Sequence, residues 1–224
     1  MDLNMLFENY ALLMDSPNST AKIRELILQL AVQGKLAPQD PTDEPAGELL
    51  KRIKSEKEKL ITEGKIRKQK PFPPITEDEI PYELPQDWEW VRLGELSTFL
   101  GGYAFKSHTY VKSSKNQVIR LGNVKNSGLL LDQNPVFVSD DIANDKKEYL
   151  LEEGDLLITM TGTRAKRDYL FVTLVKNYHL NRINLYLNQR VGCLRFFEPL
   201  YIELFEKFLK ADNLLDNLFS IKDF

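Results

Sequence analysis

Both tryptophans of this 224-residue chain lie two positions apart, at Trp88 and Trp90, and they mark a boundary between two unlike halves. Before them the chain is rich in lysine and glutamate and shows helical spacing of apolar residues. After them come alternating apolar and polar residues, glycine turns and nearly all the β-branched runs. An indole at such a boundary either closes a core or stacks on another group. We expect these two to pack where the second half begins.

The first half contains three amphipathic patterns. Apolar residues predict a helix over 2–14, a second helix that is capped by Ser19 or Thr20 and ends at Gly34, and a third that starts near Pro45 and ends at Gly64. The stretch 65–85 contains five prolines and few periodic apolar residues, which predicts an extended linker lying on a neighbouring surface. The chain therefore divides into a helical region (1–64), a linker (65–85) and a domain (86–224).

Short strands dominate that last domain. Alternation predicts a first strand over 88–93, and apolar runs between turn residues predict strands over 117–121, 129–131, 136–138, 155–160, 170–175, 183–187 and 192–197. Residues 199–218 return to helical spacing. Strands followed by a late helix predict an α+β fold with a mixed or antiparallel sheet.

Charge is informative locally rather than in total. A net charge of −3 argues against a protein that coats nucleic acid through charge alone. The basic residues of 51–70 are either a solvated helix face or a contact surface. A tighter cluster and a looser set of cations follow in the second half: Arg164, Lys166 and Arg167, then Arg182, Arg190 and Arg195. The single Cys193 excludes an intrachain disulfide and fits a reducing cytoplasm, and neither a membrane span nor a secretory signal is predicted.

Enzymatic chemistry finds little support in the motifs. His108 and His179 have no second His or Cys at ligand spacing, so no metal site is predicted. Nucleophile-elbow, Walker and methyltransferase motifs are missing from the sequence, so no catalytic residue is predicted. The acidic groups at 140–141 and 152–155 have the chemistry to bind a cation, but acid pairs beside turns are usually solvated.

Two loops have the residue types that DNA recognition requires. The segment 159–167 combines hydroxyls, a glycine and three cations after an apolar strand, and 101–106 combines a glycine pair with aromatic and basic residues. Such groups either contact base edges in a groove or hold phosphates. The alternative for 159–167 is an ordinary hairpin loop. Asn188 and Gln189 are able to contact bases, or else to tie loops together as buried polar groups.

Several ordered landmarks resemble one family. The run KIRELILQLAVQGKL at 22–36, with 38–41 and 44–46, resembles the helical assembly region of specificity subunits of type I restriction–modification systems. IPYELPQDWEWVRLGEL at 80–96 resembles the start of their target recognition domain, and EGDLLITMTG at 153–162 and LNQRVG at 187–192 resemble two later landmarks. The likeness extends from about Phe7 to Phe224.

The resemblance implies a DNA-recognition module without catalysis of its own. Such subunits carry two recognition domains separated by long helices, and each domain recognises one half of a split double-stranded DNA sequence. Methylation subunits that hold S-adenosylmethionine, and restriction/translocase subunits that use ATP and Mg²⁺, dock around them. The resemblance thus implies no cofactor bound by this chain, no membrane partner and a cytoplasmic location.

The chain departs from that pattern because it carries one recognition domain and ends before the family's Gly-rich closing segment. It is therefore a fragment, a truncated product, or a half-subunit that pairs with a second copy of itself and recognises a symmetric site. We expect a fragment.

The candidate site residues follow from the loops and the resemblance. Predicted phosphate contacts are Lys106, Lys125, Lys166 and Arg167. Predicted groove contacts are Thr161, Thr163, Arg164, Asn123 and Gln189, and Tyr103, Arg120 and Arg182 complete the DNA-binding candidates. Predicted subunit-interface residues are Leu26, Ile27, Leu30, Leu49 and Ile53. The alternative functions are a helical protein-interaction scaffold, a half-subunit that acts as a homodimer, and a free-standing enzyme.

Overall fold

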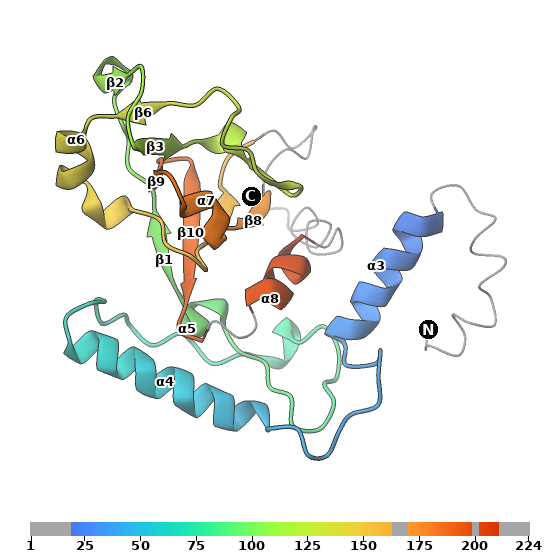
Figure 1. The fold of residues 1–224 in the computed structure, drawn as a ribbon. Helices are drawn as coiled ribbons and strands as arrows, with labels where there is room; N and C mark the ends of the chain where they lie inside the picture. Colours follow the sequence, from blue (N-terminus) through green and yellow to red (C-terminus); the bar gives the residue numbers. More distant parts are fainter. Residues whose placement is uncertain (1–18, 163–169, 199–201, 211–224) are drawn as a thin grey trace. The chain divides into compact units, whose positions relative to one another are not determined.

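The computed structural model describes residues 19–162, 170–198 and 202–210 (Figure 1). Contacts among them divide the chain into two compact units, 19–96 and Ser97–Lys210. Residues 65–96, which include both tryptophans, are grouped with the helices. The boundaries predicted at residues 64 and 85 remain predictions. They separate regions of different expected function, and contacts alone do not assign function. The predicted helix over 2–14 lies outside the described residues.

Helix α3 (Ser19–Val32) ends where the sequence predicts. Gly34 has a φ of 66°, a left-handed conformation that glycine adopts without the strain of a Cβ. Its N–H donates to the Ala31 carbonyl at 3.0 Å, and the Lys35 N–H donates to the Leu30 carbonyl at 2.8 Å. These bonds satisfy the last carbonyls of the helix, so the predicted glycine C-terminus is confirmed.

Helix α4 (Ala46–Thr62) begins directly after Pro45 and is followed by Gly64, whose φ is 70°. Ile53 from its apolar stripe is buried. The first N–H of the helix, at Ala46, donates to the Asp87 carbonyl at 2.9 Å, so a backbone group near the tryptophans caps it. The predicted third helix is confirmed.

The proline-rich stretch is extended, with one short 3₁₀ helix, η1 (Glu77–Glu79). Arg92 donates to both carboxylate oxygens of Glu79, at 2.7 and 2.8 Å, and to the carbonyls of Pro73 and Pro74, both at 3.1 Å. We call this group of bonds the Arg92 clasp. It fixes the middle of the linker to residues that follow the tryptophans.

The predicted strand over 88–93 is wrong. Asp87 has a φ of 67°, and the Trp88 N–H donates to the Pro85 carbonyl at 3.3 Å, so the chain turns here. Residues 88–92 pair with no strand of the described chain, and the short helix α5 (Leu93–Leu96) follows. An alternating apolar and polar sequence forms a strand only where a neighbouring strand is available to pair with its backbone.

The tryptophans pack within the helical unit. The Trp88 indole N–H donates to the Gln39 Oε1 at 2.9 Å, and the ring remains 41% exposed. The Trp90 ring lies 5.0 Å from that of Tyr82, centroid to centroid, and Tyr82 belongs to the proline-rich stretch. The Trp90 ring therefore serves as a packing group, as predicted, whereas Trp88 is held by a hydrogen bond and its ring is exposed.

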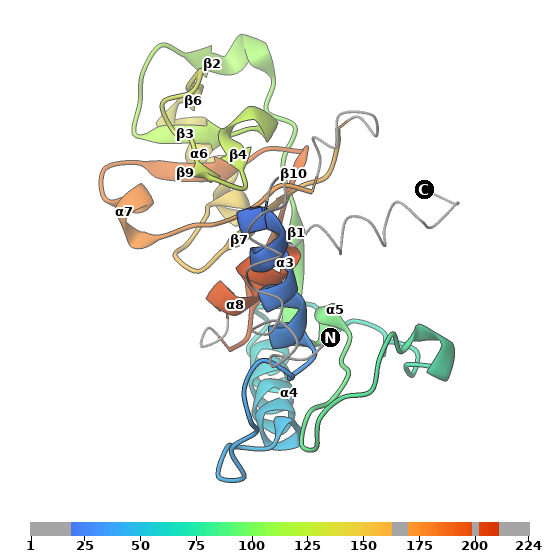
Figure 2. The ribbon, with the colours of Figure 1, turned by 90° about the vertical axis from the view of Figure 1, so that its right-hand side faces the viewer.

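The second unit contains two four-stranded sheets and a two-stranded ribbon (Figures 1 and 2). The first sheet is antiparallel, in the order β1 (Ser97–Gly101), β10 (Val191–Phe196), β7 (Leu156–Thr159) and β8 (Val172–Leu174). The second is mixed, in the order β2 (Tyr110–Val111), β6 (Phe137–Val138), β3 (Asn116–Ile119) and β9 (Asn184–Leu187). The ribbon pairs β4 (Val124–Lys125) with β5 (Gly128–Leu129). The predicted α+β class is confirmed.

Short helices connect these strands. They are η2 (Ser107–Thr109), η3 (Leu121–Asn123), α6 (Asp140–Asp145), η4 (Lys147–Tyr149), α7 (Asn177–Leu180) and α8 (Ile202–Leu209). Helix α8 confirms the late helix, although the ends of the predicted span 199–218 lie outside the described residues. The sequence did not predict α6 or α7.

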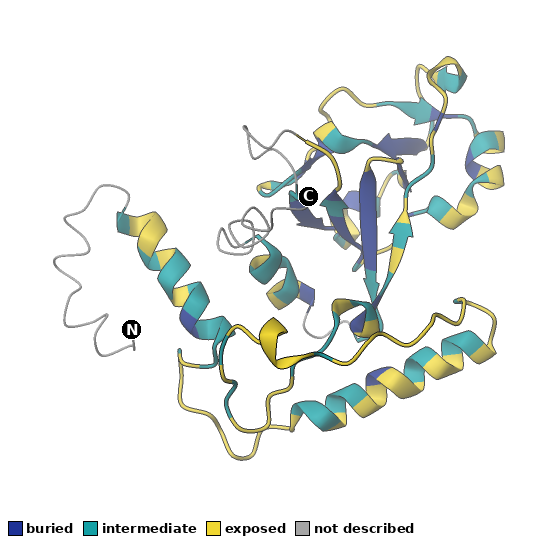
Figure 3. Ribbon diagram, turned by 180° about the vertical axis from the view of Figure 1, so that it is seen from behind, coloured by how far each residue is buried: buried dark blue, intermediate teal, exposed yellow. Residues whose placement is uncertain are grey.

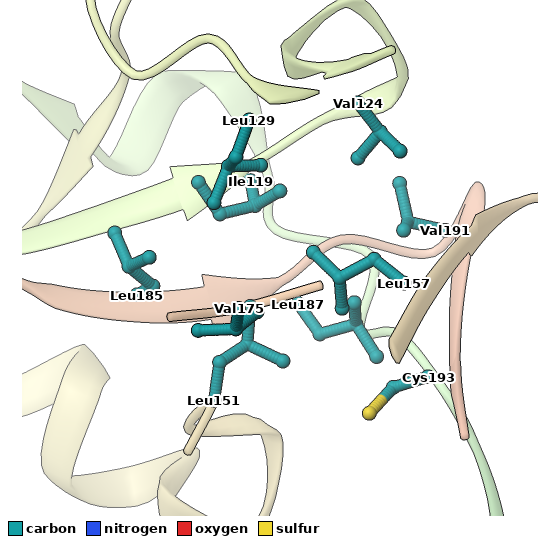
Figure 4. Close-up of a cluster of buried hydrophobic side chains, with 10 residues drawn as sticks. All are labelled: Ile119, Val124, Leu129, Leu151, Leu157, Val175, Leu185, Leu187, Val191 and Cys193. Carbon is teal, nitrogen blue, oxygen red and sulfur yellow. The ribbon is translucent and has the colours of Figure 1, made fainter. Parts of the chain in front are cut away.

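One core joins the two sheets. Ile119 and Leu187 from the mixed sheet pack with Leu157, Val191 and Cys193 from the antiparallel sheet (Figure 4). Strand β10 is buried along most of its length, as the dark blue arrow in Figure 3 shows. Burial raises the pKa of the Cys193 thiol well above its ordinary value, so this cysteine is a packing group rather than a nucleophile.

Candidate nucleic-acid interface

The ends of strands β1, β3, β7 and β9 and the start of strand β10 meet at the same edge of the second unit. Gly101 at the end of β1 pairs with Gly192, and Thr159 at the end of β7 pairs with Val191. The parallel pair β3–β9 places Ile119 beside Leu187. The segments that continue from these ends therefore lie together. We call residues 102–106, 120–123, 160–162 and 188–190 the convergent edge.

Backbone hydrogen bonds hold the segments of the convergent edge to one another. The Asn188 N–H donates to the Ile119 carbonyl at 3.1 Å, and the Gln189 N–H donates to the Tyr103 carbonyl at 2.9 Å. The Met160 N–H donates to the Arg190 carbonyl at 3.1 Å. The turn between β9 and β10 is thus bonded to three other segments, and its position does not depend on exposed side chains.

The β4–β5 ribbon adjoins the same region. The Lys125 ammonium lies 4.9 Å from the centroid of the Phe171 ring, and the Asn126 side-chain oxygen accepts the Val172 N–H at 2.9 Å. Phe171 and Val172 follow the undescribed residues 163–169. The Leu170 N–H donates to the Thr159 carbonyl at 3.1 Å, so the chain leaves and rejoins the sheet at this edge. The predicted contacts Thr163, Arg164, Lys166 and Arg167 lie outside the described residues.

Three predicted DNA contacts are exposed on the convergent edge, namely Lys106, Thr161 and Gln189. Backbone bonds join the segments that carry Thr161 and Gln189, and Lys106 follows three residues after Tyr103, whose carbonyl accepts the Gln189 N–H. Arg182 is also exposed, but it precedes Asn184, which pairs with Asn116 at the start of β3. It therefore lies at the other end of the mixed sheet, and the structure does not bring it to the other candidates.

The prediction that Asn123 contacts a groove is wrong for this conformation, because the side chain is 2% exposed and fully bonded. Its oxygen accepts the Arg120 N–H at 2.9 Å, and its NH₂ group donates to the Leu130 and Gln133 carbonyls, both at 2.9 Å. Asn123 uses all the donors that a base contact would need. It is a structural amide.

Tyr103, Arg120 and Lys125 also make contacts within the chain. The Tyr103 ring packs on Phe105 and Tyr149, with centroids 5.0 and 5.3 Å away, and the Lys146 ammonium lies 4.7 Å from its centroid. The half-buried Tyr103 ring thus has packing contacts, and its predicted role in DNA binding stays a prediction. The half-buried Arg120 donates from Nη2 to the Asn134 carbonyl at 2.7 Å. Lys125 is half-buried, with its ammonium on the Phe171 ring.

Sequence reasoning missed Lys146 and the loop that Asn123 holds. Lys146 is placed by its contacts with Tyr103 and with the Asp145 carboxylate, 2.9 Å from its ammonium. That carboxylate raises the pKa of Lys146, so it remains a cation. No local motif surrounds it, because its partner ring is distant in the sequence.

Two of the acidic groups considered as cation ligands, Asp155 and Asp140, are engaged by other side chains. Arg195 donates to both oxygens of Asp155, at 2.7 and 2.9 Å, and Asp140 accepts from the Asn116 amide at 2.7 Å. Within the described ranges no group of three or more His, Cys, Asp or Glu side chains is placed to hold a metal ion. The helices of the described chain are too short or too polar to cross a membrane.

The predicted subunit-interface residues differ in exposure. Leu30 and Ile53 are buried within the chain at 3% and 7% exposure, so their predicted role as direct contacts is corrected to packing. Ile27 is 39% exposed, and Leu26 and Leu49 are half-buried.

Comparison with known proteins identifies the family. Residues 85–215, more than half of the chain, match the family model described as the type I restriction modification DNA specificity domain. The chain is 46% identical over 153 residues to the type I restriction enzyme EcoAI specificity subunit of Escherichia coli, covering 68% of this chain and 26% of that protein. It is 65% identical over 77 residues to the EcoEI specificity subunit of the same organism, covering 34% of this chain and 13% of that protein. The chain thus spans about a quarter or less of these relatives.

Two solved structures are also similar. The HsdS subunit from Thermoanaerobacter tengcongensis is 15% identical with a TM-score of 0.41, over 86% of this chain and 40% of that one. A chain from a study of complex assembly and conformational transition of the type I R-M system is 16% identical with a TM-score of 0.41, over 88% of this chain and 42% of that one. Because the specificity-domain model matches more than half of the chain, this chain belongs to the type I restriction–modification DNA specificity family.

Proposed function

We propose that this chain recognises one half of a bipartite double-stranded DNA sequence, and directs the methylation and restriction subunits of a type I complex to it. The observation that carries the proposal is the convergent edge, where Thr161 and Gln189 are exposed on segments joined by backbone bonds and Lys106 is exposed three residues after Tyr103. A cation, a hydroxyl and a carboxamide are the groups that proteins use to hold phosphates and contact base edges. Membership of a DNA specificity family supports the same function.

Within this proposal the residues divide by chemistry. Lys106 and Lys125 hold phosphates, together with Lys166 and Arg167 from the undescribed segment. Gln189 and Thr161 contact base edges, together with Arg164 and Thr163. The catalytic steps, and the S-adenosylmethionine, ATP and Mg²⁺ that they need, belong to the partner subunits.

The test uses the chain assembled with the methylation subunit of its own system and a library of random DNA duplexes. Gln189→Ala should relax the preference at one base position by about 1–3 kcal/mol. Lys106→Ala should weaken binding to all sequences alike and reduce the slope of log affinity against log salt by about one. Arg182→Ala is the matched control, because this exposed cation lies away from the convergent edge. Equal binding of all sequences by the unmodified complex would contradict the proposal.

We also propose that the helical unit contacts a partner, either a methylation subunit or a second copy of this chain. The exposed Ile27 supports this, because an apolar side chain beside half-buried Leu26 gains from being covered. Ile27→Glu should weaken co-purification with the methylation subunit and leave the fold intact. Lys22→Glu introduces the same carboxylate at an exposed position of α3 and should have no effect on co-purification.

A further inference from the structure

One exposed loop of the second unit is held through its carbonyl groups. Asn123 donates to the carbonyls of Leu130 and Gln133, both at 2.9 Å. Gln117 donates to the Leu131 carbonyl at 2.6 Å. Arg120 donates to the Asn134 carbonyl at 2.7 Å. Four of the five carbonyls between residues 130 and 134 are therefore bonded to the side chains of Gln117 in β3, Asn123 in η3, and Arg120 between them. We call residues 130–134 the amide-held loop.

The donors of these bonds are fixed. Gln117 and Asn123 are each 2% exposed, so their amides have no access to water and depend on the loop carbonyls. The oxygen of Asn123 is engaged as well, by the Arg120 N–H. Disrupting this arrangement leaves buried donors unsatisfied, at a cost that keeps the loop in one conformation.

The carbonyls of the loop are bonded to the interior of the unit, and its polar side chains are exposed to solvent. Asp132, Gln133 and Asn134 are all exposed. A loop with fixed main chain and exposed polar side chains is prepared to contact a ligand, because little conformational entropy is lost on binding. Its one charged side chain, Asp132, is negative and disfavours a phosphate as that ligand, so the groups able to contact DNA are the exposed carboxamides of Gln133 and Asn134, which match base edges.

The amide-held loop is joined to the convergent edge. Arg120, which binds the Asn134 carbonyl, directly follows Ile119, and the Ile119 carbonyl accepts the Asn188 N–H at 3.1 Å. One residue beyond Asn188 is Gln189, a proposed base contact. Gln133 therefore offers a second exposed carboxamide, on a loop bonded to the segment that follows β3, and a carboxamide matches the N6 and N7 atoms of adenine.

We propose that Gln133 is a specificity-determining residue that contacts an adenine edge, and that Asn123 is the positioning residue that holds it in place. This deepens the proposed function and rests on it. Gln133 recognises the base through its exposed amide, and Asn123 acts only through the main chain of the loop.

The experiment measures the base preference of the complex with the methylation subunit, position by position, on a library of random duplexes. Gln133→Ala should lower the discrimination at one position about tenfold and leave the other positions unchanged. Gln133→Glu should change the preference at that position from adenine to cytosine, because a carboxylate accepts from the cytosine amino group. Asn181→Ala is the matched control, since this exposed carboxamide lies beside Arg182, away from the convergent edge.

The positioning role has its own readout. Asn123→Asp places a carboxylate against the carbonyls of Leu130 and Gln133. It should lower discrimination at the same position as Gln133→Ala, and the double variant should add nothing further. A lower melting temperature with an unchanged base profile would show that Asn123 has no positioning role.

The outcomes separate this inference from the proposed function. If the unmodified complex selects a sequence and both Gln133 variants select it equally well, Gln133 makes no base contact and the inference is overturned. If the unmodified complex selects no sequence, the proposed function itself fails. Should Asn123→Asp not fold, the two Gln133 variants still decide whether the loop contacts DNA.

Discussion

Arg195 and Asp155 form a two-pronged ion pair in the second unit, with Nε 2.7 Å from one carboxylate oxygen and Nη2 2.9 Å from the other. The side chain of Asp155 is 3% exposed. Its Oδ2 also accepts the Glu152 N–H at 2.9 Å, and Arg195 donates to the Leu150 carbonyl at 2.6 Å. The pair thus connects strand β10 to the turn that precedes β7.

Asp155→Asn should destabilise the chain, because it removes the charge that balances Arg195 and one acceptor of the turn. Loss of one partner of a buried pair costs about 3 kcal/mol in the free energy of unfolding. Urea denaturation measures the change. Glu152→Gln is the control, since this carboxylate is 68% exposed and 4.0 Å from Arg195, and its removal should cost less than about 1 kcal/mol.

Gly102→Ala should disrupt the convergent edge. A Cβ at this position would overlap with the backbone carbonyl of Asn188, and a backbone group cannot move aside as a side-chain end can. We expect a loss of about 2 kcal/mol in the free energy of unfolding, together with weaker DNA binding. Gly122→Ala is matched to it, because a Cβ there meets nothing within 4 Å. Equal stability of the two variants would show that the close approach does not exist in solution.

His179 should make stability depend on pH. Burial, and then the charge of Lys176, lower the pKa of His179 from its ordinary 6.5, and its Nδ1 accepts the Lys176 N–H at 3.0 Å. The unfolded chain therefore takes up the proton more readily than the folded one. The contribution of His179 to stability is complete above pH 6.5 and declines as the pH falls below that value. The denaturation midpoint of the unmodified chain should be lower at pH 5.5 than at pH 7.5. His179→Gln should remove this decline. His108→Gln, which changes an exposed histidine, should retain it.

The Arg92 clasp should open in acid. Hydrogen bonds from Arg92, and then from Thr76, lower the pKa of Glu79 from 4.5 to about 2. The ionised carboxylate therefore stabilises the clasp above pH 4.5, and this contribution is lost as the pH falls towards 2. Tryptophan fluorescence reports on the region, because both tryptophans of the chain lie beside it. Wild type and Arg92→Gln should differ in denaturant resistance above pH 4.5 and converge near pH 2; a constant difference would contradict this account.

Removing the helices tests where the units divide. Deletion of residues 1–64 takes away Gln39, the partner of the Trp88 indole, and Lys57, which donates to the Gly94 carbonyl at 3.1 Å. Residues 65–96 should then become sensitive to trypsin, while deletion of residues 1–96 should leave the second unit folded and resistant. Resistance of residues 65–96 in the shorter deletion would place them in the second unit instead.

The sequence predicted the apolar strands well, and the reason is local. Strands such as β7 and β10 lie at the centre of their sheet, and their continuous apolar runs record burial on both faces. Strand β1, with the sequence STFLG, was not predicted because polar residues and glycine obscure its pattern. Its place comes from pairing with β10, at a distance in the chain that periodicity does not encode.

The candidate site was predicted in part, because residue type does not distinguish a buried amide from an exposed one. Asn123 and Gln189 have the same chemistry, yet the first binds loop carbonyls and the second is exposed. Gln133 was not considered, since no glycine pair or cation cluster surrounds it. The buried donors Gln117 and Asn123, which bind the carbonyls of its loop, identify it. This arrangement is visible in the folded structure and not in a sequence motif.

The main-chain bonds of the convergent edge have an evolutionary consequence. The turn that carries Gln189 is held by backbone groups of Asn188 and Ile119, and these bonds form whatever side chain stands at position 189. Substitution of the exposed residues therefore carries little penalty in folding. Under the proposed function, substitutions at the exposed positions change the recognised DNA sequence one side chain at a time, while the buried strands beneath continue to specify a single structure.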